Sequence, residues 1–146
     1  MKYASIFAGA LLVLAAGPAL AAKAFTTDAV HMFAGPGDNF PQVMRLSSGR
    51  AITIHGCVAN YNWCDVEWRG NRGWVMGGAL TLAYQDASTS VSDLGRSLNI
   101  PNVSFDVRSY WEKNYQTRPW YADRDDWYRA SGGAERDALP NTSSRQ

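Results

Sequence analysis

The chain has 146 residues, which is enough for one ordinary domain with additional segments at its ends. Its 14 Lys and Arg residues nearly balance its 13 Asp and Glu residues, giving a formal net charge of +1. A protein that binds nucleic acid through the phosphates carries a clear basic excess, and this chain does not. We therefore expect no nucleic-acid partner.

Residues 1–21 have the pattern of a secretory signal peptide. Lys2 precedes an apolar run over residues 6–16, and Ala19-Leu20-Ala21 places small residues where signal peptidase requires them. The run is too short to span a bilayer comfortably and no second run follows, so we expect no integral membrane span after cleavage. The sequence predicts a periplasmic or secreted protein; the alternative is an N-terminal anchor that is retained.

Residues 24–82 contain short strand-like segments separated by turns rich in Gly, Pro and Ser. The segments occupy residues 24–32, 40–46, 51–58, 64–68, 72–75 and 81–84. Many short strands in so few residues are typical of a small all-β barrel. We expect a type II′ hairpin turn at Gly70-Asn71, because Gly adopts positive φ at the first central position without a steric penalty.

Both cysteines, Cys57 and Cys64, lie within this segment. An exported chain with two cysteines is expected to form one disulfide. Strict alternation places Cys57 on the face opposite to Ile52 and Ile54, whereas Cys64 shares the face of Val66. Either a β-bulge at Gly56 corrects the phase, or Cys57 lies beyond the regular ladder.

The remainder of the chain differs in composition. Residues 83–99 form a polar linker, with Asp93 as the expected cap of a brief helix. Residues 100–129 form an aromatic-rich extension, in which we expect one strand at 103–107 and one short helix at 108–116. Residues 130–146 are rich in small and charged side chains and are predicted to be disordered. The extension either packs on the barrel or presents a surface to a partner: we expect Trp111 and Tyr115 to pack, and leave Trp120 and Trp127 open.

Several of these motifs resemble the bacterial SH3 (SH3b) domain. They are Ala34-Gly35-Pro36-Gly37, Phe40-Pro41, Gly56-Cys57, Trp63-Cys64-Asp65-Val66 and Arg72-Gly73-Trp74-Val75. The extension is similar to one that small exported proteobacterial members carry. The resemblance implies an SH3-like barrel, no cofactor and a non-catalytic binding role, with peptidoglycan or its peptides as the ligands of the better-understood members. Family members commonly have Asn and Arg where this chain has His31 and Phe33.

Two further kinds of chemistry deserve comparison with this interpretation. The set of His31, His55 and the two cysteines has the residue types of a zinc site, but its spacing matches no standard finger. A thiol enzyme needs an unpaired cysteine, which a disulfide removes. We therefore predict no metal and no catalytic residues.

The predicted function is a non-catalytic exported module associated with the cell wall. Its candidate ligand-binding residues are Phe33, Tyr61, Trp63, Asp65 and Arg72. The expected ligand is peptidoglycan or a peptide, held between the 35–37 loop and the loop that joins the cysteines. The alternative is a structural or protein-interaction module whose aromatic extension docks on the barrel or on a periplasmic protein.

Overall fold

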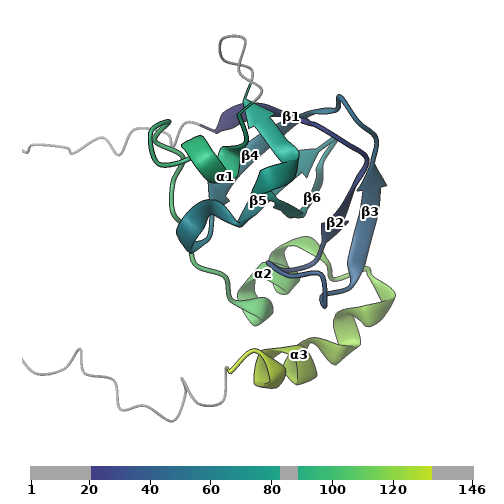
Figure 1. Cartoon of the computed structure of the whole chain (residues 1–146). Helices are drawn as coiled ribbons and strands as arrows, with labels where there is room; N and C mark the ends of the chain where they lie inside the picture. Colours follow the sequence, from purple (N-terminus) through teal and green to yellow (C-terminus); the bar gives the residue numbers. More distant parts are fainter. Residues whose placement is uncertain (1–20, 83–88, 133–146) are drawn as a thin grey trace, which may run out of the picture.

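The computed structural model describes residues 21–82 and 89–132 (Figure 1). The expected signal peptide, apart from its last residue, lies outside the described residues. The same holds for residues 83–88 of the expected linker and residues 133–146 of the expected tail.

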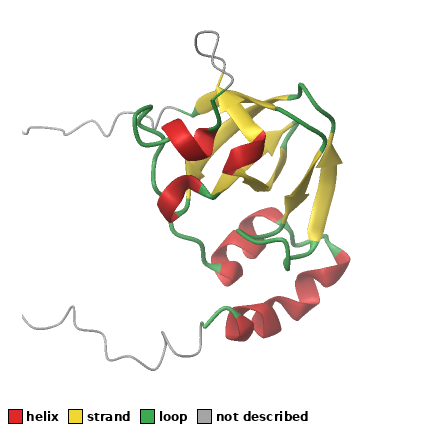
Figure 2. Cartoon of the chain, in the orientation of Figure 1, coloured by secondary structure: helices red, strands yellow, loops and turns green. Residues whose placement is uncertain are grey.

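The described chain begins with seven strands that form one antiparallel sheet (Figures 1 and 2). The strands are β1 (Ala22–Thr26), β2 (Val30–Phe33), β3 (Gln42–Leu46), β4 (Ala51–Cys57), β5 (Trp63–Trp68), β6 (Asn71–Met76) and β7 (Leu80–Leu82). Their order is β3-β2-β6-β5-β4-β1-β7. The all-β prediction is confirmed, and the sheet is open rather than a closed barrel, since no pairing joins β3 to β7 within the described residues.

The core follows the alternation of the sequence. Ile54 of β4, Val66 of β5, Val75 of β6 and Leu80 of β7 are all completely buried, and Met32 of β2 joins them. Removing these aliphatic side chains from water is the main force that holds the sheet together. At Gly73 a Cβ would lie 2.3 Å from Met32 Cγ, so only Gly lets β6 approach β2 this closely.

The phase conflict in β4 is resolved by a β-bulge. The register shifts between Ile54, which pairs with Val66, and Gly56, which pairs with Asp65. His55 is the extra residue of the bulge, and its insertion shifts the register so that Cys57 pairs directly with Cys64. The disulfide joins this pair, with a Cα–Cα distance of 4.0 Å.

Two local predictions in the sheet are wrong. The expected strand at 24–32 is divided into β1 and β2 by a bend at 27–29. The hairpin loop lies at Arg69-Gly70, one residue earlier than expected, and Trp68 pairs with Asn71. Both loop residues have positive φ (48° and 78°), which defines a type I′ turn rather than type II′.

Three short helical segments belong to the sheet domain and the linker, and a fourth lies in the extension. The 3₁₀ helix η1 (Ala59–Tyr61) joins β4 to β5, and η2 (Gly77–Ala79) joins β6 to β7. The helix α1 (Val91–Leu94) lies in the expected linker, where Ser90 rather than Asp93 occupies the N-cap position. The last, a 3₁₀ turn η3 (Pro119–Asp123), belongs to the extension.

The extension contains two α-helices and no strand among its described residues, which corrects the expected strand at 103–107. Only one isolated bridge forms there, parallel, between Cys57 and Asn102. The reason is local: the Asp106 carboxylate accepts a hydrogen bond from the Ser109 amide (2.9 Å) and so starts helix α2 (Val107–Asn114). Helix α3 (Arg124–Ala130) follows η3 and had not been predicted.

The helices of the extension lie against one end of the sheet, with α3 farther from the strands than α2 (Figure 1). Among the described residues, none of the helices combines the length and the apolar character that a membrane span requires.

Candidate functional site

Asp65 and Arg72, two of the predicted ligand contacts, bind each other on adjacent strands. Arg72 donates two hydrogen bonds to the Asp65 carboxylate, from Nε (2.8 Å) and Nη2 (2.7 Å). Tyr110 of α2 donates a third to the same carboxylate (2.6 Å). Asp65 is only 6% exposed, so these bonds replace the water that the carboxylate lost on burial. This pair connects the sheet to the extension.

Tyr110 in α2 and Tyr115, which follows its last residue, have altered acidity. Burial raises the pKa of Tyr110 far above its ordinary value, and the negative charges of a neighbouring tyrosinate and of Asp65 act in the same direction. Burial likewise raises the pKa of Tyr115, whose hydroxyl donates to the Arg72 carbonyl (2.8 Å). Both hydroxyls therefore remain protonated and act as hydrogen-bond donors to the sheet.

Aromatic side chains fill the interface between the extension and the sheet. Trp111 is fully buried and its indole N–H donates to the Ala34 carbonyl (2.8 Å). Trp127 of α3 stacks on Phe40 with ring centres 5.2 Å apart, and Trp120 packs on Trp111 at 4.7 Å. Trp120 and Trp127, left open by the sequence, thus contribute to packing. The extension covers one side of the loop between β2 and β3.

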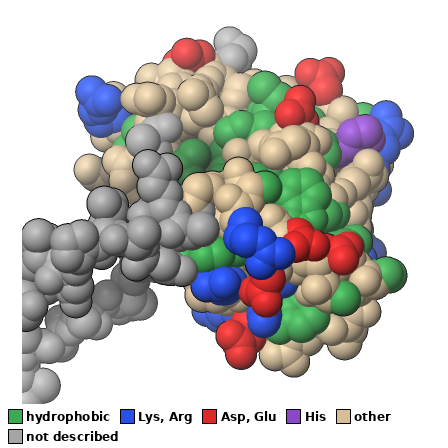
Figure 3. Space-filling view, turned by 90° about the horizontal axis from the view of Figure 1, so that it is seen from below, with side chains coloured by type: hydrophobic (Ala, Val, Ile, Leu, Met, Phe, Trp, Pro, Cys, Tyr) green, Lys and Arg blue, Asp and Glu red, His purple; other side chains and the backbone are tan. Residues whose placement is uncertain are grey.

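The outer surface of the extension carries charges of both signs. Seen from the side of α3, basic and acidic side chains lie next to one another (Figure 3). Arg108 pairs with Asp125 (3.1 Å), and Arg129 pairs with Asp126. This mixture is typical of a solvated face and does not favour an anion site.

Phe33 and Trp63 line an open apolar pocket. Their rings meet edge to face with centres 5.9 Å apart. The pocket has a volume of about 250 Å³, and its remaining wall is formed by Val30, His31, Asp38, Met76 and Ala79. Met76 is 57% exposed, so the pocket presents apolar surface to solvent.

Residues 28–81 match the family model of the bacterial SH3 domain. The chain carries a bacterial SH3 domain. The match runs from just before β2 to β7 and leaves β1 and the extension outside it. No curated protein and no solved structure is significantly similar to the chain. Bacterial SH3 domains are in general non-catalytic binding modules, commonly associated with the cell wall.

Tyr61, the remaining candidate, lies in the SH3 domain away from the apolar pocket. It is 6% exposed, and its hydroxyl donates to the Ile100 carbonyl (3.3 Å). Of the five predicted residues, only Phe33 and Trp63 line the apolar pocket. The structure places Asp65 and Arg72 under the extension and Tyr61 beside α1.

Met76 is a pocket residue that the sequence interpretation missed. In the SH3 domain Trp63 pairs directly with Met76 across the β5–β6 hairpin. Counting outward from a turn at Arg69-Gly70 gives this pairing, whereas a turn at Gly70-Asn71 places Trp63 opposite Gly78. The error in the turn position therefore concealed Met76.

The residues of the metal and thiol alternatives have other partners. Both cysteines are in the disulfide, so neither is a thiolate ligand or nucleophile. His55 contacts Glu67, with 3.0 Å between Nε2 and Oε2, and His31 packs edge to face on Phe33. Across residues 21–82 and 89–132, no group of three or more His, Cys, Asp or Glu side chains is arranged to hold a metal ion.

Proposed function

We propose that the protein is an exported, non-catalytic module that binds an extended peptide or glycan-peptide of the bacterial cell wall. The observation that carries the proposal is the open apolar pocket of Phe33 and Trp63 within a bacterial SH3 domain. In this proposal residues 1–21 are a signal peptide, residues 24–82 form the binding domain, and residues 100–129 are a structural extension. The disulfide is compatible with the oxidising periplasmic or extracellular compartment.

The pocket has the physical character of a binding surface for a partly apolar chain. Covering Phe33, Trp63 and Met76 removes apolar area from water, which is the general driving force of association. Asp38 and His31 also line the pocket, but its exposed surface is almost entirely apolar, so the ligand contacts would be mainly hydrophobic. The ligand would lie across Phe33, Trp63 and Met76.

A pull-down on purified peptidoglycan tests the proposal. We expect the wild-type protein to sediment with the polymer, and Trp63→Ala and Phe33→Ala to remain in solution. Phe25→Ala is the matched control, since Phe25 is a 40% exposed aromatic on β1 that does not line the pocket. Sedimentation that is absent for wild type, or unchanged in both pocket variants, contradicts the proposal.

The packing of the extension favours a second candidate, a protein-interaction module with no wall ligand. In this candidate the aromatic extension docks on the barrel, as the burial of Trp111 and Tyr115 supports, and a periplasmic protein rather than the wall is the partner. Photo-crosslinking in the periplasm from position 76 distinguishes the two, because a protein adduct is expected only for the second. Bridging of the cysteines also leaves no thiol for enzyme chemistry of the cysteine type.

A further inference from the structure

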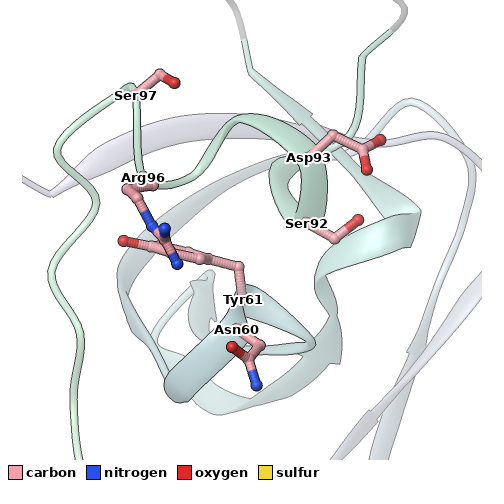
Figure 4. A pocket seen from close by; sticks show the side chains of 6 residues that line it. All are labelled: Asn60, Tyr61, Ser92, Asp93, Arg96 and Ser97. Atoms are coloured by element: carbon pink, nitrogen blue, oxygen red, sulfur yellow. The ribbon is translucent and has the colours of Figure 1, made fainter.

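A second pocket lies between η1 and α1 and shares no residue with the apolar pocket. Its volume is about 300 Å³, at the small end of the range for ligand sites. Figure 4 shows its six lining residues, which are Asn60, Tyr61, Ser92, Asp93, Arg96 and Ser97. All except Tyr61 are charged or amide- or hydroxyl-bearing aliphatic side chains. The pocket is thus polar where the first is apolar.

The floor of this pocket is held rigidly. A Cβ at Gly77 would lie 2.0 Å from the Tyr61 carbonyl oxygen, and a Cβ at Gly95 would lie 2.2 Å from Tyr61 Cδ1. Tyr61 therefore packs directly against both glycines. Its hydroxyl donates a hydrogen bond to the Ile100 carbonyl and accepts one from the Asn102 side-chain amide. Asn60 and Tyr61 both have left-handed backbones, with φ of 68° and 56°. Consecutive non-glycine residues of this kind persist only where the surrounding structure fixes them.

The two charges of the pocket do not neutralise each other. Asp93 and Arg96 are three residues apart, a spacing at which opposite charges on a helical turn usually meet. No ion pair joins them, however, and Arg96 forms none with any other residue that the structure describes. Asp93 accepts one hydrogen bond, from the Ser90 hydroxyl (2.7 Å). In Figure 4 the Arg96 side chain extends toward Tyr61 and Asn60, whereas Ser92 and Asp93 project from α1.

We infer that this pocket binds a small zwitterion, namely a free amino acid or the end of a short peptide. The guanidinium of Arg96 would receive the carboxylate, since it offers paired N–H donors that match carboxylate geometry. The carboxylate of Asp93 would receive the ammonium group. The Asn60 amide and the hydroxyls of Ser92 and Ser97 would bind the polar atoms between the two charges. The ring of Tyr61 would form an apolar base.

The inference is tested by titrating the ¹⁵N-labelled full chain with glycine and with glycylglycine, and following the amide resonances. We expect saturable shifts confined to residues 60–61 and 92–97. N-acetylglycine, which lacks the ammonium group, and glycinamide, which lacks the carboxylate, should each bind at least about ten-fold more weakly, as loss of one charged hydrogen bond predicts. Tighter binding of glycine identifies a free amino acid as the ligand class, and tighter binding of glycylglycine identifies a peptide end.

Two exposed substitutions complete the test without endangering the fold. Arg96→Gln and Asp93→Asn should each weaken binding at least about ten-fold, whereas Arg45→Gln, a control on the exposed part of β3, should not change it. The inference is overturned if neither ligand produces saturable shifts at these residues, if both charge-deficient analogues bind as well as glycine, or if Arg96→Gln binds unchanged. Because the readout uses free ligands and a separate pocket, its result is independent of sedimentation with peptidoglycan.

Discussion

The protein has two groups of aromatic side chains with opposite environments, one beneath the extension and one at the open pocket. On the extension side Trp74, Trp111 and Tyr115 are at most 2% exposed. By contrast, Phe33 and Trp63 remain partly exposed and line the pocket. The residue types are the same; the difference is that a covalently attached segment covers one surface and leaves the other open. The comparison indicates that aromatic content alone does not identify a binding surface.

The largest expected effect comes from removing the central aromatic of the covered surface. Trp111→Ala should lower the free energy of unfolding by about 3–5 kcal/mol, because it leaves a large cavity and an unpaired Ala34 carbonyl. Urea denaturation followed by circular dichroism measures this change. Phe25→Ala, at a 40% exposed position, is the matched control and should cost less than about 1 kcal/mol. If Trp111→Ala lowers the free energy of unfolding no more than Phe25→Ala does, the packing of the extension contributes little to stability.

The ion pair beneath the extension should give the next largest effect. Asp65→Asn should lower stability by about 3 kcal/mol, since it leaves the half-buried Arg72 without its counter-charge. Glu67→Gln removes a more exposed carboxylate from its contact with His55 and should cost less than about 1 kcal/mol. A thermal or urea melt of both variants provides the comparison. If Asp65→Asn is as stable as the wild type, the ion pair of Asp65 and Arg72 is not needed to hold the extension on the sheet.

Alkaline pH should weaken the covered surface selectively. Tyr110 and Tyr115 have raised pKa values in the folded state, so above pH 10 the unfolded chain releases protons that the folded chain retains. Their contribution is therefore constant below about pH 10 and is lost as pH rises, at up to about 1.4 kcal/mol per pH unit for each tyrosine.

Urea midpoints measured between pH 8 and pH 11 test this expectation. Tyr110→Phe should reduce the slope above pH 10 because it removes one of the two groups. If the variant and the wild type have the same slope, Tyr110 does not titrate differently in the folded state.

The smallest effect on stability is expected at the open pocket. Phe33→Ala and Trp63→Ala remove side chains that retain solvent contact, and each should change the free energy of unfolding by less than about 1.5 kcal/mol. The same variants should abolish sedimentation with peptidoglycan under the proposed function. A loss comparable to that of Trp111→Ala would instead identify Phe33 and Trp63 as part of the core and would remove the distinction between the two surfaces.

Much of the sheet could be predicted because its strands alternate. Ile52, Ile54 and Val66 have period-two spacing, and they are buried as that spacing requires. The bulge at Gly56 was one of the two outcomes that the phase conflict allowed, and the register shift between Ile54 and Gly56 confirms it. The type of the β5–β6 turn could not be predicted, because Arg rarely adopts positive φ and nothing in the sequence marks Arg69 as a loop residue. Only the pairing of the two strands fixes the position of the turn.

The extension was less predictable for a different reason. Val103 and Phe105 alternate like a strand, yet the chain there runs parallel to the end of β4 for only one bridge, and a Cβ at Gly56 would lie 2.4 Å from Val103 Cγ1. That close approach, together with the cap at Asp106, replaces a strand by a single bridge and a helix. The cap at Asp106 lies within that window, whereas the approach to Gly56 depends on a distant segment, which the propensity of residues 103–107 could not reveal.

The sequence by itself determined the all-β class, the disulfide pair and the domain that carries them, because strand periodicity and cysteine number are properties of the chain. Only the tertiary structure decided which aromatics are core and which are surface. It showed Asp65 and Arg72 bound to each other beneath Tyr110, and it brought Met76 beside Trp63. The physical reason is that burial depends on which distant segment covers a side chain, and residues such as Trp63 and Trp111 have the same tendency to be covered.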